Sequence, residues 1–349
     1  MKPFFTFSQK IVILLLFFFI SIYLISKDSH PLIGCKSEDK IVKQDSLVPW
    51  KYPDVLSISD NEEGKMIKYG RSIFIETYRY IGPDVKDTNM RFAGNNMDCQ
   101  NCHWNAGTQQ NVLGLVGVYS RYPAFDERVN RIISLKERIN ECLTRSMNGK
   151  PAPDNSKELN AIDAYLKWLS TNVPKGKTAE GYRLSKIPLL NRAADTAAGR
   201  TVYLDNCVSC HALDGAGTLL MPATIVVPAD SLRGYDIPPV FGSESYNDGA
   251  GMYRLLTSTA FIFAKMPLNR ANLSIEKAYD VAAFINSQPR PHSPFVEKDY
   301  PDLKFKPIDF PFKPYDDNFP ELQHKYGPYQ PMLKEGETSK YIDPYMPLK

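Results

Sequence analysis

The sequence predicts a mainly α-helical protein made of two tandem domains that share one plan, followed by an irregular C-terminal extension. Three observations support this prediction. The pattern Cys-x-x-Cys-His occurs twice, at 99–103 and at 207–211. A Gly-Arg pair followed by a hydroxyl residue and two apolar or aromatic residues precedes each pattern, at 70–74 and at 199–203. Each half then closes with an amphipathic segment that ends before a proline.

Length and composition fit this organisation and exclude one class of function. A chain of 349 residues accommodates two ordinary domains with extensions. Its 43% hydrophobic and 23% charged residues are typical of a soluble globular protein. The net charge of +3 is too small for the basic surface that nucleic-acid binding requires, so no nucleic-acid partner is expected. We therefore look for function in local sites.

Residues 1–35 differ in character from the rest of the chain. Two lysines precede the apolar run 11–25, which is the pattern of an export signal. The run is shorter than the roughly 20 residues of a membrane span. In a second interpretation, the phenylalanines before the run lengthen it to an uncleaved membrane anchor over 4–26. In a third, Cys35 is lipidated, although a polar stretch separates it from the apolar run. All three interpretations predict a periplasmic protein.

The helical elements follow from apolar spacing. In the expected N-terminal domain, 50–176, residues 66–77 carry apolar and small side chains on one face, with Pro83 beyond the end. The closing helix of this domain carries Leu159, Ile162, Leu166 and Leu169 before Pro174. In the expected C-terminal domain, 185–290, the closing helix carries Ala278, Val281, Ala282 and Ile285 before Pro289. The remaining extension, 291–349, is rich in Pro, Tyr and Phe and is expected to wrap the surface or dock a partner.

The two Cys-x-x-Cys-His motifs predict two covalently bound c-type haems with iron. Two thiols must reach the two vinyl groups of one porphyrin, and the next residue must place an imidazole on the iron from the same side. A redox cysteine pair does not need the histidine, and zinc needs four ligands, so these alternatives and disulfides rank lowest. The predicted attachment cysteines are Cys99, Cys102, Cys207 and Cys210, and the predicted proximal ligands are His103 and His211.

The second haem has a methionine candidate for its distal ligand. Met266 follows a long loop and shortly precedes the closing helix, whereas Met221 lies far from that helix and Met252 also competes. A methionine is more often core filling than ligand, but methionine ligation raises a haem potential and suits electron transfer. The adjacent Lys265 is an alternative ligand, because an unprotonated amine also binds iron.

Cys142 occupies the corresponding place in the first half, after the motif loop and before the closing helix. It is the one cysteine of the two expected domains that haem attachment does not use. The alternatives are a buried free thiol and a disulfide to Cys35. We therefore consider Cys142 a candidate distal ligand of the first haem.

The surroundings of Cys142 favour an anion-binding helix. Ser134 and Glu137 form a capping-box pattern that begins a helix, and Gly149 is placed to end it. Arg138, Cys142 and Arg145 fall at positions i, i+4 and i+7, with Ser146 four residues after the cysteine and Arg128 and Arg131 before the helix. Guanidinium groups favour a thiolate and bind oxyanions. The alternative is a solvated basic face balanced by Glu137 and Glu141.

Several stretches resemble the thiosulfate dehydrogenase family of dihaem cytochromes c, some members of which run better as tetrathionate reductases. The resemblance covers most of the chain from Gly70 to Arg290. Its motifs, in order, are 115–125, 137–149, 165–170, 246–252 and 264–267.

The resemblance implies roles for named residues. It makes the first haem catalytic, with His103 and Cys142 as ligands and with Arg128, Arg138 and Ser146 at the anion site. It makes the second haem, with His211 and Met266, an electron-transfer haem, and pairs Lys265 with Met266 in ligand switching. The implied reaction is oxidation of two thiosulfates to tetrathionate, or the reverse, with a small cytochrome or similar external electron partner.

A dihaem electron carrier between a membrane donor and a soluble partner is the alternative function, because the composition and the haem motifs fit it equally well. A carrier does not need the helix with arginine, serine and cysteine, so this helix favours the enzyme. A dihaem peroxidase is a third interpretation, and no sequence element argues for it.

Overall fold

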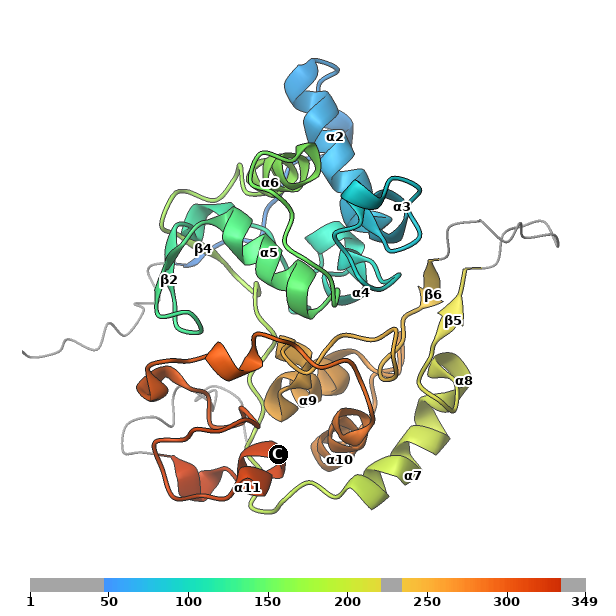
Figure 1. Ribbon diagram of the computed structural model, residues 1–349, viewed down its shortest axis with the longest axis vertical. Helices are drawn as coiled ribbons and strands as arrows, with labels where there is room; N and C mark the ends of the chain where they lie inside the picture. The colour runs from blue at the N-terminus through green and yellow to red at the C-terminus, as the bar shows by residue number, and fades with distance from the viewer. Residues whose placement is uncertain (1–46, 221–233, 334–349) are drawn as a thin grey trace, which may run out of the picture. The chain divides into compact units, whose positions relative to one another are not determined.

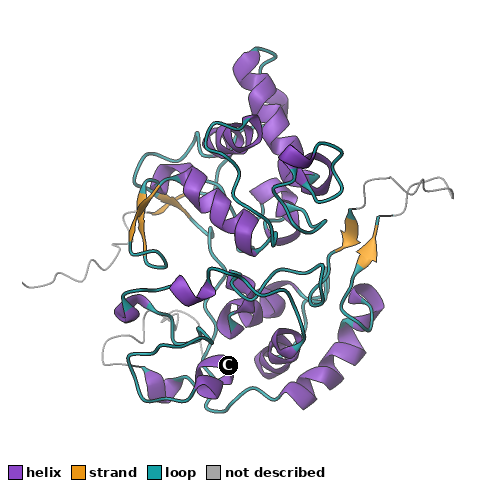
Figure 2. Ribbon diagram, in the orientation of Figure 1, coloured by secondary structure: helices purple, strands orange, loops and turns teal. Residues whose placement is uncertain are grey.

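The computed structural model describes residues 47–220 and 234–333, which are mainly helical (Figure 1 and Figure 2). The α-helices are α2 (Glu62–Ile75), α3 (Thr77–Ile81), α4 (Cys99–Cys102), α5 (Leu135–Arg145), α6 (Lys157–Leu169), α7 (Thr196–Asn206), α8 (Val208–His211), α9 (Leu255–Lys265), α10 (Ile275–Ser287) and α11 (Glu321–Tyr326). Short 3-10 turns lie at Val55–Ser57, Thr88–Met90, Asn105–Gly107, Tyr119–Arg121, Gly251–Tyr253, Val296–Lys298, Leu303–Phe305 and Gln330–Met332.

The strands of the described residues form small paired ladders that connect loops. β1 (Leu47–Val48) pairs in parallel with β4 (Thr178–Ala179). β2 (Ala124–Asp126) and β3 (Arg131–Ile133) form an antiparallel hairpin just before α5, with Phe125 opposite Ile132. β5 (Thr218–Leu219) pairs antiparallel with β6 (Tyr235–Ile237) across an irregular register. None of these ladders forms a layer of its own, so the helices define the fold.

Each half is organised by one close crossing of two helices. In the first half α2 packs on α6, and a side chain at Gly70 would place its Cβ 1.8 Å from the Ala161 carbonyl oxygen. In the second half α7 packs on α10, and a Cβ at Gly199 would lie 2.0 Å from the Asp280 carbonyl oxygen. Only glycine permits backbones to approach this closely. The Gly-Arg repeat of the sequence therefore marks the same structural position in both halves.

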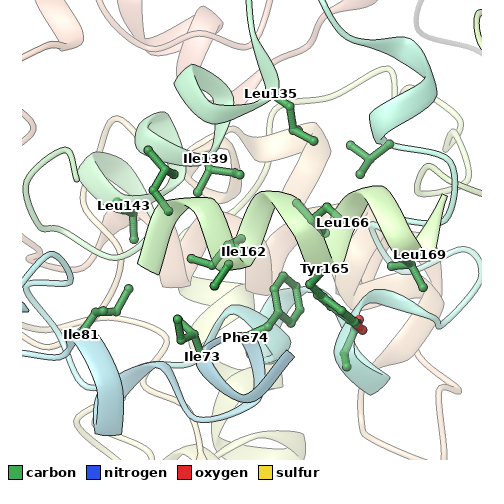
Figure 3. Close-up of a cluster of buried hydrophobic side chains, with 14 of the residues drawn as sticks. Ile73, Phe74, Ile81, Leu135, Ile139, Leu143, Ile162, Tyr165, Leu166 and Leu169 are labelled. Carbon is green, nitrogen blue, oxygen red and sulfur yellow. The ribbon is translucent and has the colours of Figure 1, made fainter. Parts of the chain in front are cut away.

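The first core lies between α2, α5 and α6, as Figure 3 shows. Ile162 and Leu166 of α6 are 2% and 3% exposed and meet Ile139 of α5 and Ile73 of α2 in one buried cluster. Burying each such side chain contributes about 1.5–3 kcal/mol, so this cluster fixes α5 against the helix crossing. That placement matters because α5 carries Cys142.

The second core includes part of the C-terminal extension. Ile308, Tyr329 and Met332 pack in the same buried cluster as the α7–α10 crossing. A smaller cluster of Val296, Tyr300 and Phe310 lies within the extension itself. The extension is thus not wholly irregular: it contains α11 and contributes to a core.

Two local sequence predictions were wrong. The first helix does not continue to Thr77, because Glu76 leaves helical geometry (φ −136°, ψ 52°) and Thr77 begins α3. Gly149 does not end α5, because the helix already ends at Arg145. The residue with left-handed backbone geometry after the helix is Asn148 (φ 47°), not Gly149. Gly149 instead permits close backbone packing, since its Cβ would lie 1.9 Å from the Phe92 carbonyl oxygen.

The expected anchor 4–26, Cys35 and Met221 lie outside the described residues. Among the helices of 47–220 and 234–333, none has the length and apolar character to cross a membrane.

Candidate haem sites and anion site

The cysteines of the first Cys-x-x-Cys-His motif lie on the one-turn helix α4. Thr77 of α3 holds the start of this helix. The Cys99 N–H donates to Thr77 Oγ1 at 3.0 Å, and the Asp98 N–H donates to Asn101 Oδ1 at 2.6 Å. Thr77 Oγ1 also lies 3.4 Å from the Cys99 sulfur. These contacts fix the start of the motif, so both cysteines of α4 are presented from one turn.

Both motif histidines are oriented through Nδ1. His103 Nδ1 lies 2.5 Å from the Leu113 carbonyl oxygen, and His211 Nδ1 lies 3.0 Å from that of Pro238. Such a bond fixes the ring and directs Nε2 away for a metal. Burial lowers the pKa of each imidazole, which favours the neutral form that binds iron. Leu113 adopts a left-handed backbone (φ 49°), a strained conformation for a bulky residue that presents its carbonyl to the ring.

A cavity of about 710 Å³ lies beside the second motif. Its lining combines Cys207, Cys210 and His211 with Met252 and Met266. An apolar cavity with two thiols and a directed imidazole fits a covalently attached haem. Met266 is the C-cap residue of α9. Met252 and Met266, the two methionine candidates among the described residues, both line this cavity, whereas Lys265 does not.

The same cavity reaches the first motif. Asn101, Cys102 and Trp104 contribute to its wall. The Trp104 ring meets the Phe261 ring of α9 edge-on, with centroids 5.7 Å apart. Because Trp104 directly follows His103, an aromatic contact joins the first motif to the helix that ends at Met266.

Helix α5 brings Cys142 to the first motif. The predicted capping box is confirmed: Ser134 Oγ accepts from the Glu137 N–H at 3.2 Å, and Glu137 Oε2 accepts from the Ser134 N–H at 2.7 Å. Burial raises the pKa of the Cys99 and Cys102 thiols to about 12, and Cys142 lies close enough to add to both shifts. The structure thus gathers the three cysteines of the first half.

Arg138 is the guanidinium that belongs to this group. Its pKa is raised, first by the charge of Cys142 and also by Glu141, against the opposing effect of burial. Its Nη1 donates to Glu141 Oε2 at 2.8 Å. The charge of Arg138 also helps to lower the pKa of His103. Arg138 therefore lies close to both proposed iron ligands of the first half.

Arg145 departs from the predicted single face. Its side chain is 7% exposed and turns away to form a bidentate ion pair with Asp299 of the extension, Nη2 to Oδ1 at 2.6 Å and Nη1 to Oδ2 at 2.9 Å. Arg128 joins the same carboxylate, with Nη1 3.3 Å from Oδ2 and 2.8 Å from the Gly249 carbonyl oxygen. Burial raises the pKa of Asp299, and the two guanidiniums oppose that shift.

The end of α5 is one of the parts of the first half that contact the second. Ser146 is the C-cap residue, and its carbonyl oxygen accepts from Asn95 Nδ2 at 3.2 Å. Asn247 Nδ2 donates to the Thr144 carbonyl oxygen at 2.9 Å. The predicted anion-site residues therefore divide into two groups, Arg138 beside Cys142 and Arg128 at the junction with the extension.

Sequence reasoning missed Asp299, Trp104 and Thr77 as parts of these sites. Trp104 carried a usable signal, since it directly follows the first motif. Asp299 carried none, because its partners lie 154 and 171 residues earlier in the chain.

The two helix crossings, the two motifs and their directed imidazoles define a dihaem c-type cytochrome, with one covalently bound haem for each motif. Family models agree: residues 89–174 match the SoxA/TsdA cytochrome c domain, and residues 194–285 match cytochrome c oxidase, cbb3-type, subunit III.

Comparison with known proteins identifies the particular family. The chain is 35% identical over 243 residues to a thiosulfate dehydrogenase of Stutzerimonas stutzeri, covering 69% of this chain and 73% of that protein. It is 36% identical over 244 residues to the thiosulfate dehydrogenase of Allochromatium vinosum, covering 68% and 83%. The chain therefore belongs to the thiosulfate dehydrogenase family.

A solved structure supports the same fold. The thiosulfate dehydrogenase (TsdBA) of Marichromatium purpuratum superposes with a TM-score of 0.63 at 27% identity. The match covers 77% of this chain and 54% of the other, so this chain spans about half of that solved protein.

Proposed function

We propose that this protein oxidises thiosulfate to tetrathionate at the first haem and passes the electrons through the second haem to an external acceptor. Two thiosulfate dianions join through one sulfur–sulfur bond, and two electrons leave for the acceptor. The reverse reaction, tetrathionate reduction, uses the same site with an external donor. The relatives' names support the class of reaction, oxidation or reduction of sulfur compounds.

The single observation that carries the proposal is the placement of Cys142 and Arg138. Helix α5 carries Arg138 and Cys142 one turn apart, and both lie close enough to the first motif to act on the ionisation of its side chains. In our proposal His103 and Cys142 hold the iron of the first haem, which supplies the redox chemistry when bound. Arg138 offers a fork of donors to a sulfur oxyanion, and Ser146 and Arg128 complete the anion site.

The second half serves electron transfer in this proposal. Cys207 and Cys210 attach the haem, and His211 and Met266 bind its iron, with Lys265 as the alternative ligand. The shared cavity wall and the contact between Trp104 and Phe261 give a short connection between the two motifs. A small soluble cytochrome is the expected partner class. The domain bounds 50–176 and 185–290 are part of the same proposal.

We further propose export to the periplasm, directed by residues 1–35. Sequence pattern alone supports this part, together with a membrane tether over 4–26 or a lipid on Cys35 as modes of attachment. Mass spectrometry of the mature protein from the membrane and soluble fractions distinguishes a cleaved, anchored or lipidated N-terminus.

The deciding experiment is a steady-state assay of the purified dihaem protein. Thiosulfate is supplied with a ferric acceptor, and tetrathionate with a reduced viologen donor. Turnover in either direction is the expected result. Silence in both directions, with both haems attached and reducible, contradicts the proposed enzyme and leaves the dihaem electron carrier.

A further inference from the structure

The C-terminal extension contacts both the side chain and the backbone of Arg128. The Asp299 carboxylate accepts a hydrogen bond from the Arg128 guanidinium, and the Tyr300 N–H donates to the Arg128 carbonyl oxygen at 2.8 Å. The Tyr300 ring lies under the same guanidinium, with the Arg128 Cζ 5.7 Å from the ring centroid. The Arg128 N–H in turn donates to Asp126 Oδ1 at 2.8 Å. Backbone and side chain of one arginine are thus both fixed, mainly by two adjacent residues of the extension.

The backbone at this point is strained. Tyr300 adopts φ +58°, which is rare for an aromatic residue. Conformations of this kind cost on the order of 1–3 kcal/mol and persist where the surroundings over-determine them, often at functional sites. Tyr300 is 5% exposed and packs with Phe310, so the extension holds this conformation from its own small core.

Asp299 also joins Arg128 to the helix that carries Cys142. The carboxylate is 2% exposed and binds Arg145, in the last turn of α5, through both oxygens. Gly249, from the loop before α9, adds a carbonyl oxygen that accepts from both guanidiniums. Any displacement of Asp299 would therefore move Arg128 relative to α5, and a misplacement of about 1 Å has large effects at a reacting site.

We propose that Asp299 and Tyr300 are positioning residues that set the Arg128 guanidinium for the sulfur oxyanion. The inference rests on the proposed function, and it gives the extension a role in substrate binding beyond stability. Asp299 acts through Arg128 and does not itself contact the anion, because a carboxylate repels a dianion and this one is saturated by two arginines.

The chain offers a matched control for Asp299. Asp309 is a second buried carboxylate of the extension, 1% exposed, and accepts from Arg254 Nε at 2.8 Å and from the Leu256 N–H at 3.0 Å. It ties the extension to the start of α9 and not to α5. Asp299→Asn and Asp309→Asn both remove a buried charge that pairs with arginine, so both are expected to lower the thermal unfolding temperature.

The test compares these variants as purified dihaem proteins. Asp299→Asn is expected to raise the KM for thiosulfate about tenfold, with kcat changed less than about twofold, while Asp309→Asn leaves KM unchanged. In an Arg128→Gln background Asp299→Asn is expected to have no further effect on KM, because the two residues act as one unit. The thiosulfate dissociation constant obtained from protection against thermal unfolding, without any electron acceptor, should rise by the same factor in Asp299→Asn.

Two results overturn the inference while leaving the proposed function intact. One is an active Asp299→Asn variant whose KM equals or falls below that of the wild type. The other is an equal rise in KM in Asp299→Asn and Asp309→Asn, which indicates a general loss of stability. A wild-type protein that is silent toward thiosulfate and tetrathionate instead contradicts the proposed function, so the two failures are distinguishable.

Discussion

The two halves of the molecule share the way in which each Cys-x-x-Cys-His motif is held and differ in the sulfur-containing residue that each half carries in addition. Both have a glycine at the helix crossing and a histidine whose Nδ1 meets a backbone carbonyl. The first half carries Cys142 on a helix with charged neighbours, whereas the second half has Met266 at a helix end that lines an apolar cavity. We therefore expect the residues that differ between the halves, and not the shared motif, to select the chemistry of each half.

The same contrast extends to the charges around each half. In the first half Arg138 pairs with Glu141, and Arg128 and Arg145 pair with Asp299 of the extension. Charged groups held at fixed positions are typical of a site that binds and converts an anion. An apolar cavity with a thioether is typical of a site that exchanges electrons with little reorganisation.

Cys142→Ala should abolish thiosulfate oxidation, with a loss of at least about 100-fold in kcat, while both haems remain attached. The distal side of the first haem loses its proposed sulfur ligand, and the second haem keeps its spectrum. Steady-state turnover, haem staining and absorption spectra measure this. Thr144→Val, two residues along the same helix, is the control and should retain turnover. Wild-type activity in Cys142→Ala would contradict the proposed catalytic role of the first haem and Cys142.

Arg138→Gln should lower kcat/KM for thiosulfate by at least about tenfold, which corresponds to about 1.4 kcal/mol of transition-state stabilisation. The change removes the guanidinium beside Cys142 and leaves Glu141 without its partner. Arg131 is a suitable control, because it pairs with Glu137 on the exposed side and is itself 57% exposed. Equal kinetic losses in Arg138→Gln and Arg131→Gln would indicate a general field effect and not a specific anion site.

Met266→Ala should lower the reduction potential of one haem and leave the other unchanged. Methionine ligation raises a haem potential, so its loss shifts the second haem downward. Met252→Ala is the matched variant, since Met252 lines the same cavity. Spectroelectrochemical titration of both proteins decides between them: a downward shift only in Met252→Ala would assign the ligand to Met252.

Sequence pattern could predict the repeated parts of this molecule and not the long-range ones. The motifs, the Gly-Arg pairs, the closing helices and the capping box at Ser134 are local signals with a periodic or chemical reason. The ion pair between Arg145 and Asp299 has no such signal, because it depends on how the extension folds back. For that reason the expected single face of Arg138, Cys142 and Arg145 was only partly correct. The same limit applied to the extension, which was expected to wrap the surface and in fact contributes a buried carboxylate.

Gly70→Ala and Gly199→Ala should destabilise their respective halves by similar amounts, about 1–3 kcal/mol each. The added Cβ would lie 1.8 Å and 2.0 Å from a backbone oxygen, so the helices must separate. Gly251→Ala is the control, because no atom lies within 4 Å of its Cβ position, and its effect should stay within about 0.5 kcal/mol. Urea unfolding measures all three. A tolerated Gly199→Ala would break the structural equivalence of the two crossings.

A further difference between the halves concerns the residue before each motif, which is Asp98 in the first half and Asn206 in the second. Burial raises the pKa of Asp98 to about 7 from an ordinary value near 3.8. The folded protein therefore binds this proton more tightly than the unfolded chain, and the stability from this group is complete below about pH 4 and is lost as the pH rises through 7.

Asp98→Asn makes the first half like the second and should remove this pH dependence. Between pH 4 and 7 the wild type should lose stability relative to Asp98→Asn, with a slope of at most about 1.4 kcal/mol per pH unit. Urea unfolding of both proteins across this range measures the difference, in which contributions from the other titrating groups cancel. Asp163→Asn is the control, because that carboxyl lies on another helix, α6, and its pKa is also raised by burial. Equal changes in the pH dependence of the unfolding free energy in Asp98→Asn and Asp163→Asn would show an effect common to buried carboxyl groups of this half. The difference between Asp98 and Asn206 would then not be specific to the first haem motif.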